Sequence, residues 1–219
     1  MQPKIRVLGI DPGTLHMGWG VVERFGTKCA YVAHGVIEPK GDLPERLVQI
    51  ETALVRMVGE QSVDAAGIES IFFHKDAQAA AKLGHARGVA MLVLARAHIP
   101  IFEYAPALVK KSICGSGRAD KSQVAKIVHM MLRIPGTLRS DETDALAIAL
   151  VHAQRSLGHR SFPPPPRSNS DAIGTTLPSM PKPSMTPQTA QLYEALKKKR
   201  KSAKSEDNHL VNRSRKSFV

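Results

Sequence analysis

The chain has 219 residues, of which 42% are apolar, and a formal net charge of +12 at pH 7. This length and apolar content predict one globular domain with a sizeable core, together with an appendage. No run of about 18 apolar residues is present, so we expect no membrane-spanning helix. Cys29 and Cys114 lack the spacing of metal ligands, and we expect them to be free thiols in a reducing cytoplasm.

The basic charge is concentrated toward the C-terminus. Residues 1–158 carry 19 Lys and Arg against 15 Asp and Glu, whereas residues 159–219 carry 12 against 4. The resulting charges of +4 and +8 favour a polyanionic partner, most often nucleic acid. A general gain in solubility is the alternative explanation.

In chain order, the spacing of apolar residues predicts alternating types of secondary structure. Strands are expected at 4–10, 18–22, 30–37, 65–69 and 100–104, and helices at 43–59, 76–97, 121–132 and 141–157. Asp42 is expected to cap the first helix, with Pro44 in its first turn, and Ser140 to cap the last helix. Strands followed by strand–helix alternation predict an α/β sheet with helices on its faces.

The composition changes after Gly158. Four successive prolines at 163–166 stiffen the chain, and a Ser-, Thr- and Pro-rich stretch extends to Pro187. A short helix is predicted over 189–201, which ends in five consecutive basic residues. We therefore predict a folded domain over 1–158 and a largely disordered basic tail over 159–219.

Four carboxylates lie at the ends of predicted elements. They are Asp11 after the first strand, Glu69 at the end of the fourth, and Asp141 and Asp144 in the first turn of the last helix. Ligands gather at the carboxyl ends of strands in open sheets, so these acids are predicted to converge. Converged carboxylates repel one another unless a divalent cation lies between them, which predicts metal-dependent phosphate chemistry. An ordinary turn at 11–13 and helix-dipole stabilisation are the structural alternatives.

Several motifs give the sequence a family resemblance. They are GIDPGT at 9–14, Gly18-Trp19-Gly20, IES at 68–70 followed by Phe72, KLGHARG at 82–88 and DETDALAIAL at 141–150. In this order and spacing they resemble the RuvC-type Holliday junction resolvases over residues 2–157. The resemblance implies an RNase H-like mixed sheet flanked by helices, a homodimer, and Mg²⁺-dependent nicking of four-way DNA junctions in recombination and repair. It also implies a branch-migration helicase complex as a partner and a cytoplasmic location.

The same resemblance assigns catalytic roles to single residues. The catalytic and metal-binding acids of the family map onto Asp11, Glu69, Asp141 and Asp144, which are expected to hold two Mg²⁺ ions per subunit, with Mn²⁺ able to replace them. Lys110 and Lys121 match basic residues near the family's active site. A lysine beside the scissile phosphate offsets charge that develops in the transition state, although two solvated lysines are the alternative.

The resemblance also suggests DNA contacts. Phe72 and Phe73 follow Glu69 where the family places an aromatic residue that meets bases at the junction centre, and exposed aromatics stack on unpaired bases. Core packing is the alternative for at least one of them. Lys82 and Arg87 are expected to face DNA, together with Lys110 and Lys121, and ordinary helix-surface charge is the alternative.

Other classes of function fit parts of this pattern. An actin-like ATP-binding kinase also places Asp-x-Gly-Thr at a strand end, but the chain contains no second phosphate-binding glycine motif and is short for two such lobes. A non-catalytic junction-binding protein would have no use for four intact acids. A nuclease of the same fold that acts on another nucleic acid, such as RNA, stays open, and the substrate that is cut would decide.

Overall fold

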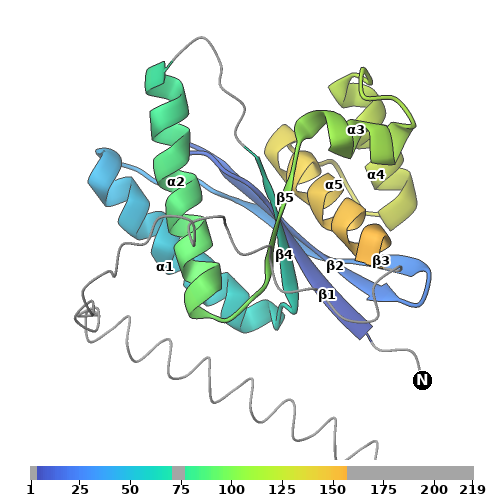
Figure 1. Cartoon of the computed structure of the whole chain (residues 1–219), viewed down its shortest axis with the longest axis horizontal. Helices are drawn as coiled ribbons and strands as arrows, with labels where there is room; N and C mark the ends of the chain where they lie inside the picture. The colour runs from blue at the N-terminus through green and yellow to red at the C-terminus, as the bar shows by residue number, and fades with distance from the viewer. Residues whose placement is uncertain (1–3, 71–76, 157–219) are drawn as a thin grey trace, which may run out of the picture. The chain divides into compact units, whose positions relative to one another are not determined.

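The computed structural model describes residues 4–70 and 77–156, which form a mixed sheet flanked by helices (Figure 1). The five strands lie in the order β3-β2-β1-β4-β5. The elements are β1 (Lys4–Asp11), β2 (Met17–Phe25), β3 (Lys28–Ile37), α1 (Leu43–Gln61), β4 (Ala65–Glu69), α2 (Ala77–Arg96), β5 (Ile101–Tyr104), α3 (Pro106–Cys114), α4 (Lys121–Leu132) and α5 (Ser140–Arg155). The predicted α/β sheet with helices on its faces is confirmed. The predicted tail over 159–219 lies outside the described residues, as do Phe72 and Phe73.

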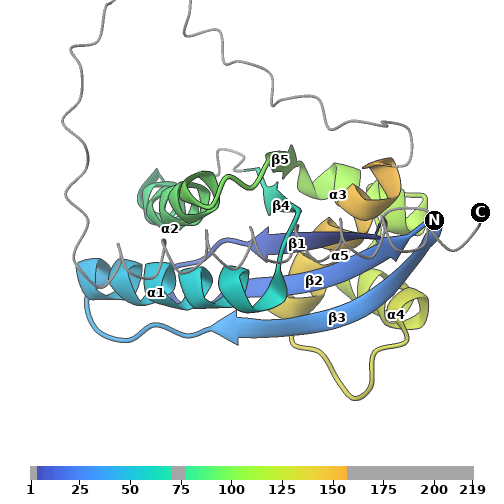
Figure 2. The same cartoon turned by 90° about the horizontal axis from the view of Figure 1, so that it is seen from below.

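The pairing of the strands brings two strand ends together. Strand β1 runs antiparallel to β2 and parallel to β4, while β3 lies at the edge beyond β2 (Figure 2). Ile10 pairs with Ile68, so the next residues, Asp11 and Glu69, leave the sheet side by side. Gly18 of β2 pairs with Asp11 on its other side. Three neighbouring strands therefore meet around Asp11.

Glycines allow α5 to lie directly on the backbone of the sheet. A Cβ added to Gly9 would come within 1.9 Å of the carbonyl oxygen of Ala145, and one added to Gly18 within 2.0 Å of the carbonyl oxygen of Asp141. At Gly67 the nearest atom would be a side-chain methyl carbon of Ile148 at 2.8 Å. Real side chains do not tolerate these distances, so glycine at these positions sets the height of α5 above the sheet.

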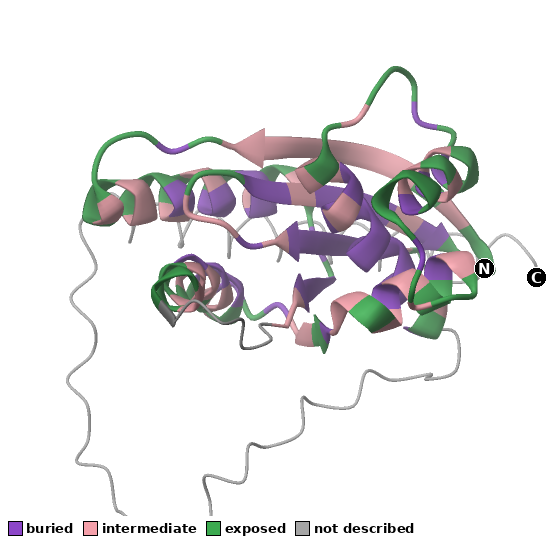
Figure 3. Cartoon of the chain, turned by 90° about the horizontal axis from the view of Figure 1, so that it is seen from above, coloured by how far each residue is buried: buried purple, intermediate pink, exposed green. Residues whose placement is uncertain are grey.

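Helix α5 is the centre of the core on its side of the sheet. Its residues from Ala145 to Ala153 are all buried, and α3 and α4 cover it with apolar side chains that include Val109, Val124 and Val128. Helices α1 and α2 lie on the other side of the sheet (Figure 1). Strands β1 and β2 are largely buried, whereas β3 is partly exposed along its length (Figure 3).

Two local features differ from the sequence prediction. The apolar pattern predicted no helix over 106–114, but α3 occupies this range, and its short length leaves little periodicity to detect. The prediction of Ser140 as a helix cap was wrong. Arg139 takes the capping position instead, and its backbone N–H donates to Glu142 Oε2 at 2.8 Å. The prediction that Asp42 caps α1 is confirmed, because its carboxylate accepts from the backbone N–H of Glu45 at 3.0 Å.

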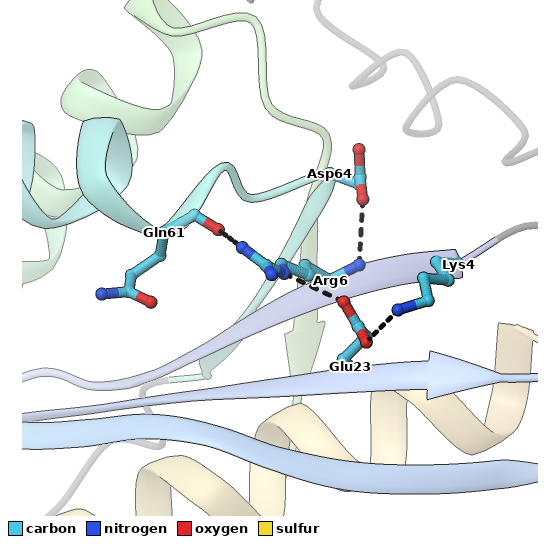
Figure 4. Close-up of polar contacts among 5 residues, drawn as sticks. All are labelled: Lys4, Arg6, Glu23, Gln61 and Asp64. Carbon is cyan, nitrogen blue, oxygen red and sulfur yellow. Dashed lines mark hydrogen bonds and ion pairs between the residues drawn. The ribbon is translucent and has the colours of Figure 1, made fainter. Parts of the chain in front are cut away.

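Arg6 fastens the opposite end of β1 to its surroundings (Figure 4). Its guanidinium donates to the carboxylate of Glu23 at 3.1 Å and to the carbonyl oxygen of Gln61 at 2.8 Å. Its backbone N–H donates to Asp64 at 2.9 Å. These contacts join the start of β1 to β2 and to the connection between α1 and β4. They hold β4 in the register that places Glu69 beside Asp11.

The glycine contacts predict an asymmetry between two conservative substitutions. Gly9→Ala should reduce the free energy of unfolding by about 1–3 kcal/mol, because the added methyl meets backbone that cannot move aside. Gly84→Ala in α2 has nothing within 4 Å of the new carbon, so it should raise stability by about 0.5–1 kcal/mol. Urea unfolding of both variants would test this, and equal stability of the two would contradict it.

Candidate active site

Four acids meet at the end of the sheet where β1 and β4 finish. Asp11 and Glu69 come from the strand ends, and the start of α5 places Asp141 over Gly18 and brings Asp144 close enough to raise the pKa values of both strand acids. Burial, followed by the negative charges of Glu69, Asp144 and Asp141 in that order of importance, raises the pKa of Asp11 to about 8. The structure thus brings all four predicted acids into one electrostatic cluster.

Within the cluster, Asp11 and Glu69 are joined by a hydrogen bond. Burial, followed by the charge of Asp144, raises the pKa of Glu69 above its ordinary value. With a pKa of about 8, the Asp11 carboxyl group keeps a proton at neutral pH, and its hydrogen bond lowers the pKa of Glu69 against these two effects. Sharing this proton reduces the repulsion between the two acids.

A lysine neutralises the helix side of the cluster. Lys121, the first residue of α4, places its ammonium 3.1 Å from the carboxylate of Asp144 and 3.4 Å from the hydroxyl of Ser140. The hydrogen bond to Asp144, and then its charge, raise the pKa of Lys121. A cavity of about 210 Å³ opens beside this pair, with Ser140 and Thr143 in its lining. The cavity leaves room for a phosphate group next to Lys121 and Asp144.

The acids fit a hard divalent cation by their chemistry, because carboxylate oxygens are the ligands that Mg²⁺ prefers. In residues 4–70 and 77–156, no three His, Cys, Asp or Glu side chains are already arranged to hold a metal ion. The proton on Asp11 and the ammonium of Lys121 supply positive charge to the cluster instead. A bound cation would replace both of these sources of charge.

The other predicted site residues occupy different positions. Lys110 on α3 is half-buried and close enough to Glu69 to lower its pKa, against the stronger opposing effects. Lys82 on α2 is exposed. Arg87, on the same helix, is mostly buried and pairs with Glu103. Lys110 and Lys121 are therefore assembled with the side chains of the acids, Arg87 contacts the backbone of Glu69, and Lys82 is exposed on α2.

A second set of contacts surrounds the first turn of α5 and was not found by the sequence analysis. Arg139 donates to Glu38 at 2.6 Å, and His16 lies 3.4 Å from the same carboxylate oxygen. These contacts join the start of α5 to the segment after β3 and the loop before β2. Arg139 and Glu38 lie 101 positions apart, so no local pattern could indicate their pairing.

The raised pKa of Asp11 predicts how stability depends on pH when no metal is present. Between its ordinary pKa of 3.8 and about 8, the folded protein holds a proton that the unfolded chain releases. This proton therefore contributes to the free energy of unfolding at low pH, and the contribution is lost as the pH rises from 3.8 to about 8. Asp11→Asn keeps the shape of the side chain without its charge. At pH 8 in EDTA, the free energy of unfolding of this variant should therefore be at least about 1 kcal/mol higher than that of the wild type.

Thermal unfolding in EDTA from pH 5 to pH 9 would measure this difference. The gap between Asp11→Asn and the wild type should widen as the pH rises. Added Mg²⁺ should stabilise the wild type more than the variant, because the variant lacks one charged ligand. Parallel pH profiles for the two proteins would show that Asp11 has an ordinary pKa.

Comparison with known proteins relates this chain to a family. The family model described as "Crossover junction endodeoxyribonuclease RuvC" matches residues 7–152. The protein of that name from Sorangium cellulosum is 54% identical over 150 residues, which cover 68% of this chain and 84% of the relative. The one from Agrobacterium fabrum is 45% identical over 166 residues, or 73% of this chain and 95% of the relative.

Solved structures agree with these sequence matches. Thermus thermophilus RuvC is 33% identical, with a TM-score of 0.63 over 69% of this chain and 95% of that one. The same protein in complex with a Holliday junction substrate is 32% identical, with a TM-score of 0.66 over 70% of this chain and 96% of that one. The yeast mitochondrial Holliday junction resolvase Ydc2, 14% identical with a TM-score of 0.53 over 73% of this chain and 83% of that one, shares the fold. The chain therefore belongs to the RuvC family of crossover junction endodeoxyribonucleases.

Proposed function

We propose that this protein resolves four-way DNA junctions by paired, symmetric nicks in homologous recombination and DNA repair, using Mg²⁺ held by its four acids. The observation that carries the proposal is the cluster around Asp11, where burial and the nearby charges of Glu69, Asp144 and Asp141 together raise the pKa of Asp11 to about 8. Such a cluster lowers the stability of the metal-free protein, and a bound divalent cation offsets the repulsion between its carboxylates. Relatives that are named crossover junction endodeoxyribonucleases support the reaction type.

The residues of the site have separate tasks in this reaction. Asp11, Glu69, Asp141 and Asp144 would hold two Mg²⁺ ions, which Mn²⁺ can replace. When bound, such ions supply a hydroxide nucleophile and stabilise the leaving oxygen. Asp11 would lose its proton when these ions bind. Lys121, no longer paired with Asp144, and Lys110 would offset the negative charge that develops on the phosphate. The products would carry 5′ phosphates.

Junction recognition requires contacts beyond the acids. We assign phosphate contacts to Lys82, Lys110 and Lys121, and base stacking to Phe72 or Phe73, which lie outside the described residues. The DNA contact expected for Arg87 stays a prediction. The complex of the T. thermophilus protein with a Holliday junction substrate supports binding of this class of DNA.

The assembly and location of the protein belong to the same proposal. Two nicks in strands of like polarity call for two active sites related by symmetry, which a homodimer provides. We propose that the dimer acts with a branch-migration helicase complex in the cytoplasm. None of the helices within residues 4–70 and 77–156 combines the length and the apolar content that a membrane-spanning helix needs.

Asp144→Asn tests the role of the acids. The substitution removes a charged ligand but keeps the side-chain shape, so cleavage of a synthetic mobile four-way junction should fall by at least about 100-fold in Mg²⁺. Junction binding in EDTA should be retained or become tighter, because one negative charge near the DNA is lost. Near-normal cleavage by this variant would contradict the assignment of the four acids.

Glu142→Gln provides the matched control for this experiment. Glu142 lies in the same helical turn and carries the same charge, but its carboxylate faces His34 at 3.8 Å and the N–H of Arg139. A glutamine can keep the second contact, so cleavage should stay close to the wild-type rate. Parallel assays on duplex DNA and an RNA hybrid, expected to be cut poorly, would distinguish a nuclease with another substrate.

The basic tail generates a separate prediction. Deleting residues 159–219 removes +8 of the +12 charge and none of the proposed catalytic residues. Binding to any DNA should weaken, and its dependence on salt should become shallower, because fewer phosphates are neutralised. The preference for junction over duplex should remain. A full-length variant with glutamine at the five basic positions 197–201 should show part of the same change, and an unchanged salt slope in both proteins would reject a DNA-tethering tail.

A further inference from the structure

Arg87 links α2 to the ends of two strands at the edge of the active site. One terminal nitrogen, Nη2, lies 2.6 Å from the carboxylate of Glu103 on β5. Its Nε donates to the backbone carbonyl oxygen of Glu69 at 3.3 Å. The side chain of Arg87 is only 17% exposed. The planar guanidinium therefore joins three elements, and one of its two partners belongs to a residue of the acid cluster.

Glu69 lies where the strand ends and the support of the sheet finishes. It is the last residue of β4, and its pairing with Tyr104 is the last in the ladder with β5. The next backbone N–H, that of Ser70, donates to the carbonyl oxygen of Tyr104 at 3.0 Å. Arg87 adds a charge-assisted hydrogen bond to the carbonyl of Glu69 itself, and such bonds are stronger than neutral ones.

We propose that Arg87 is a positioning residue for Glu69. By holding the carbonyl group, it fixes the rotation of the last peptide of β4 and with it the direction in which the Glu69 carboxylate leaves the strand. Glu103 holds the guanidinium in place from the neighbouring strand. This inference rests on the proposed function, because it concerns how one of the four acids is presented to a divalent cation. Residues that orient metal ligands typically change metal affinity or activity by about 10–100-fold when they are replaced.

The burial of Arg87 separates this role from a direct DNA contact. A side chain that neutralises phosphate in solution has to expose its charge, as Lys121 does with a side chain that is 71% exposed. The charge of Arg87 is instead compensated by Glu103, and its Nε is directed at backbone. Removal of Arg87 should therefore affect the metal-binding acids much more than the affinity for DNA.

The test compares Arg87→Gln with Arg96→Gln in the full-length protein. Arg96 lies on the same helix, is 24% exposed, and pairs with Glu51 on α1 at 3.3 Å, so it controls for the loss of a partly buried ion pair. Calorimetry of Mn²⁺ binding to the DNA-free protein should show affinity reduced by about 10-fold or more for Arg87→Gln and little changed for Arg96→Gln. Single-turnover junction cleavage should follow the same order, while junction affinity in EDTA and its salt slope stay within about 2-fold of the wild type.

Arg87→Lys adds a second readout. One ammonium can keep the ion pair with Glu103 but cannot also reproduce the Nε–H bond to the carbonyl of Glu69 in the same fork geometry. Thermal stability should therefore return toward the wild-type value, while Mn²⁺ affinity stays reduced. A merely structural arginine would recover both properties together, and that result would overturn the proposal.

Other outcomes also decide the question. Weaker junction binding with a shallower salt slope and unchanged Mn²⁺ affinity in Arg87→Gln would make Arg87 a DNA contact and overturn the positioning role. An equal loss of Mn²⁺ affinity in Arg96→Gln would assign the effect to general destabilisation. A wild-type protein that binds Mn²⁺ but cuts no junction contradicts the proposed function alone, because the Mn²⁺ comparison still tests Arg87. A wild-type protein that binds no Mn²⁺ overturns both.

Discussion

The direct contact between α5 and the glycines of the sheet is the constraint on which the site depends. Because Gly9 and Gly18 have no side chains, the backbone of α5 reaches the strands at Ala145 and Asp141. Gly18 pairs with Asp11, so the same contact that seats the helix brings its first turn to the end of β1. Side chains at positions 9 and 18 would hold α5 away from the strands and leave Asp141 and Asp144 farther from the strand acids. The contact that packs α5 on the sheet is thus the same contact that assembles the site.

Electrostatics gives this arrangement its chemical character. The fold forces like charges together in a partly buried place, and the metal-free protein responds by keeping a proton on Asp11 and an ammonium next to Asp144. Both responses are reversible, because a proton can leave and Lys121 is mostly exposed. The cluster is therefore under electrostatic strain that a divalent cation would relieve, and the functional residues reduce stability in the absence of their ligand.

A ring of partners supports the acids from outside. Arg139 and Glu38 hold the start of α5 against the segment after β3, while Arg87 and Glu103 hold the end of β4 from α2 and β5. None of these partners is itself one of the four acids. Arg139 and Glu38 are 101 positions apart, whereas Arg87 and Glu103 lie on the consecutive elements α2 and β5. The geometry of the site is therefore determined by several parts of the domain at once.

The sequence by itself determined the sheet flanked by helices and the positions of the four acids at the ends of elements. Apolar periodicity and capping signals such as Asp42 act over a few residues, so they can be predicted from the sequence. Short α3 carried too little periodicity to be predicted, and the cap at Arg139 depended on Glu142 reaching back to it. Only the tertiary structure decided the elevated pKa of Asp11, the seating of α5 on Gly9 and Gly18, and the pairing of Arg87 with the backbone of Glu69. These properties depend on burial and on distances between remote segments, and such distances exist only once the chain has folded.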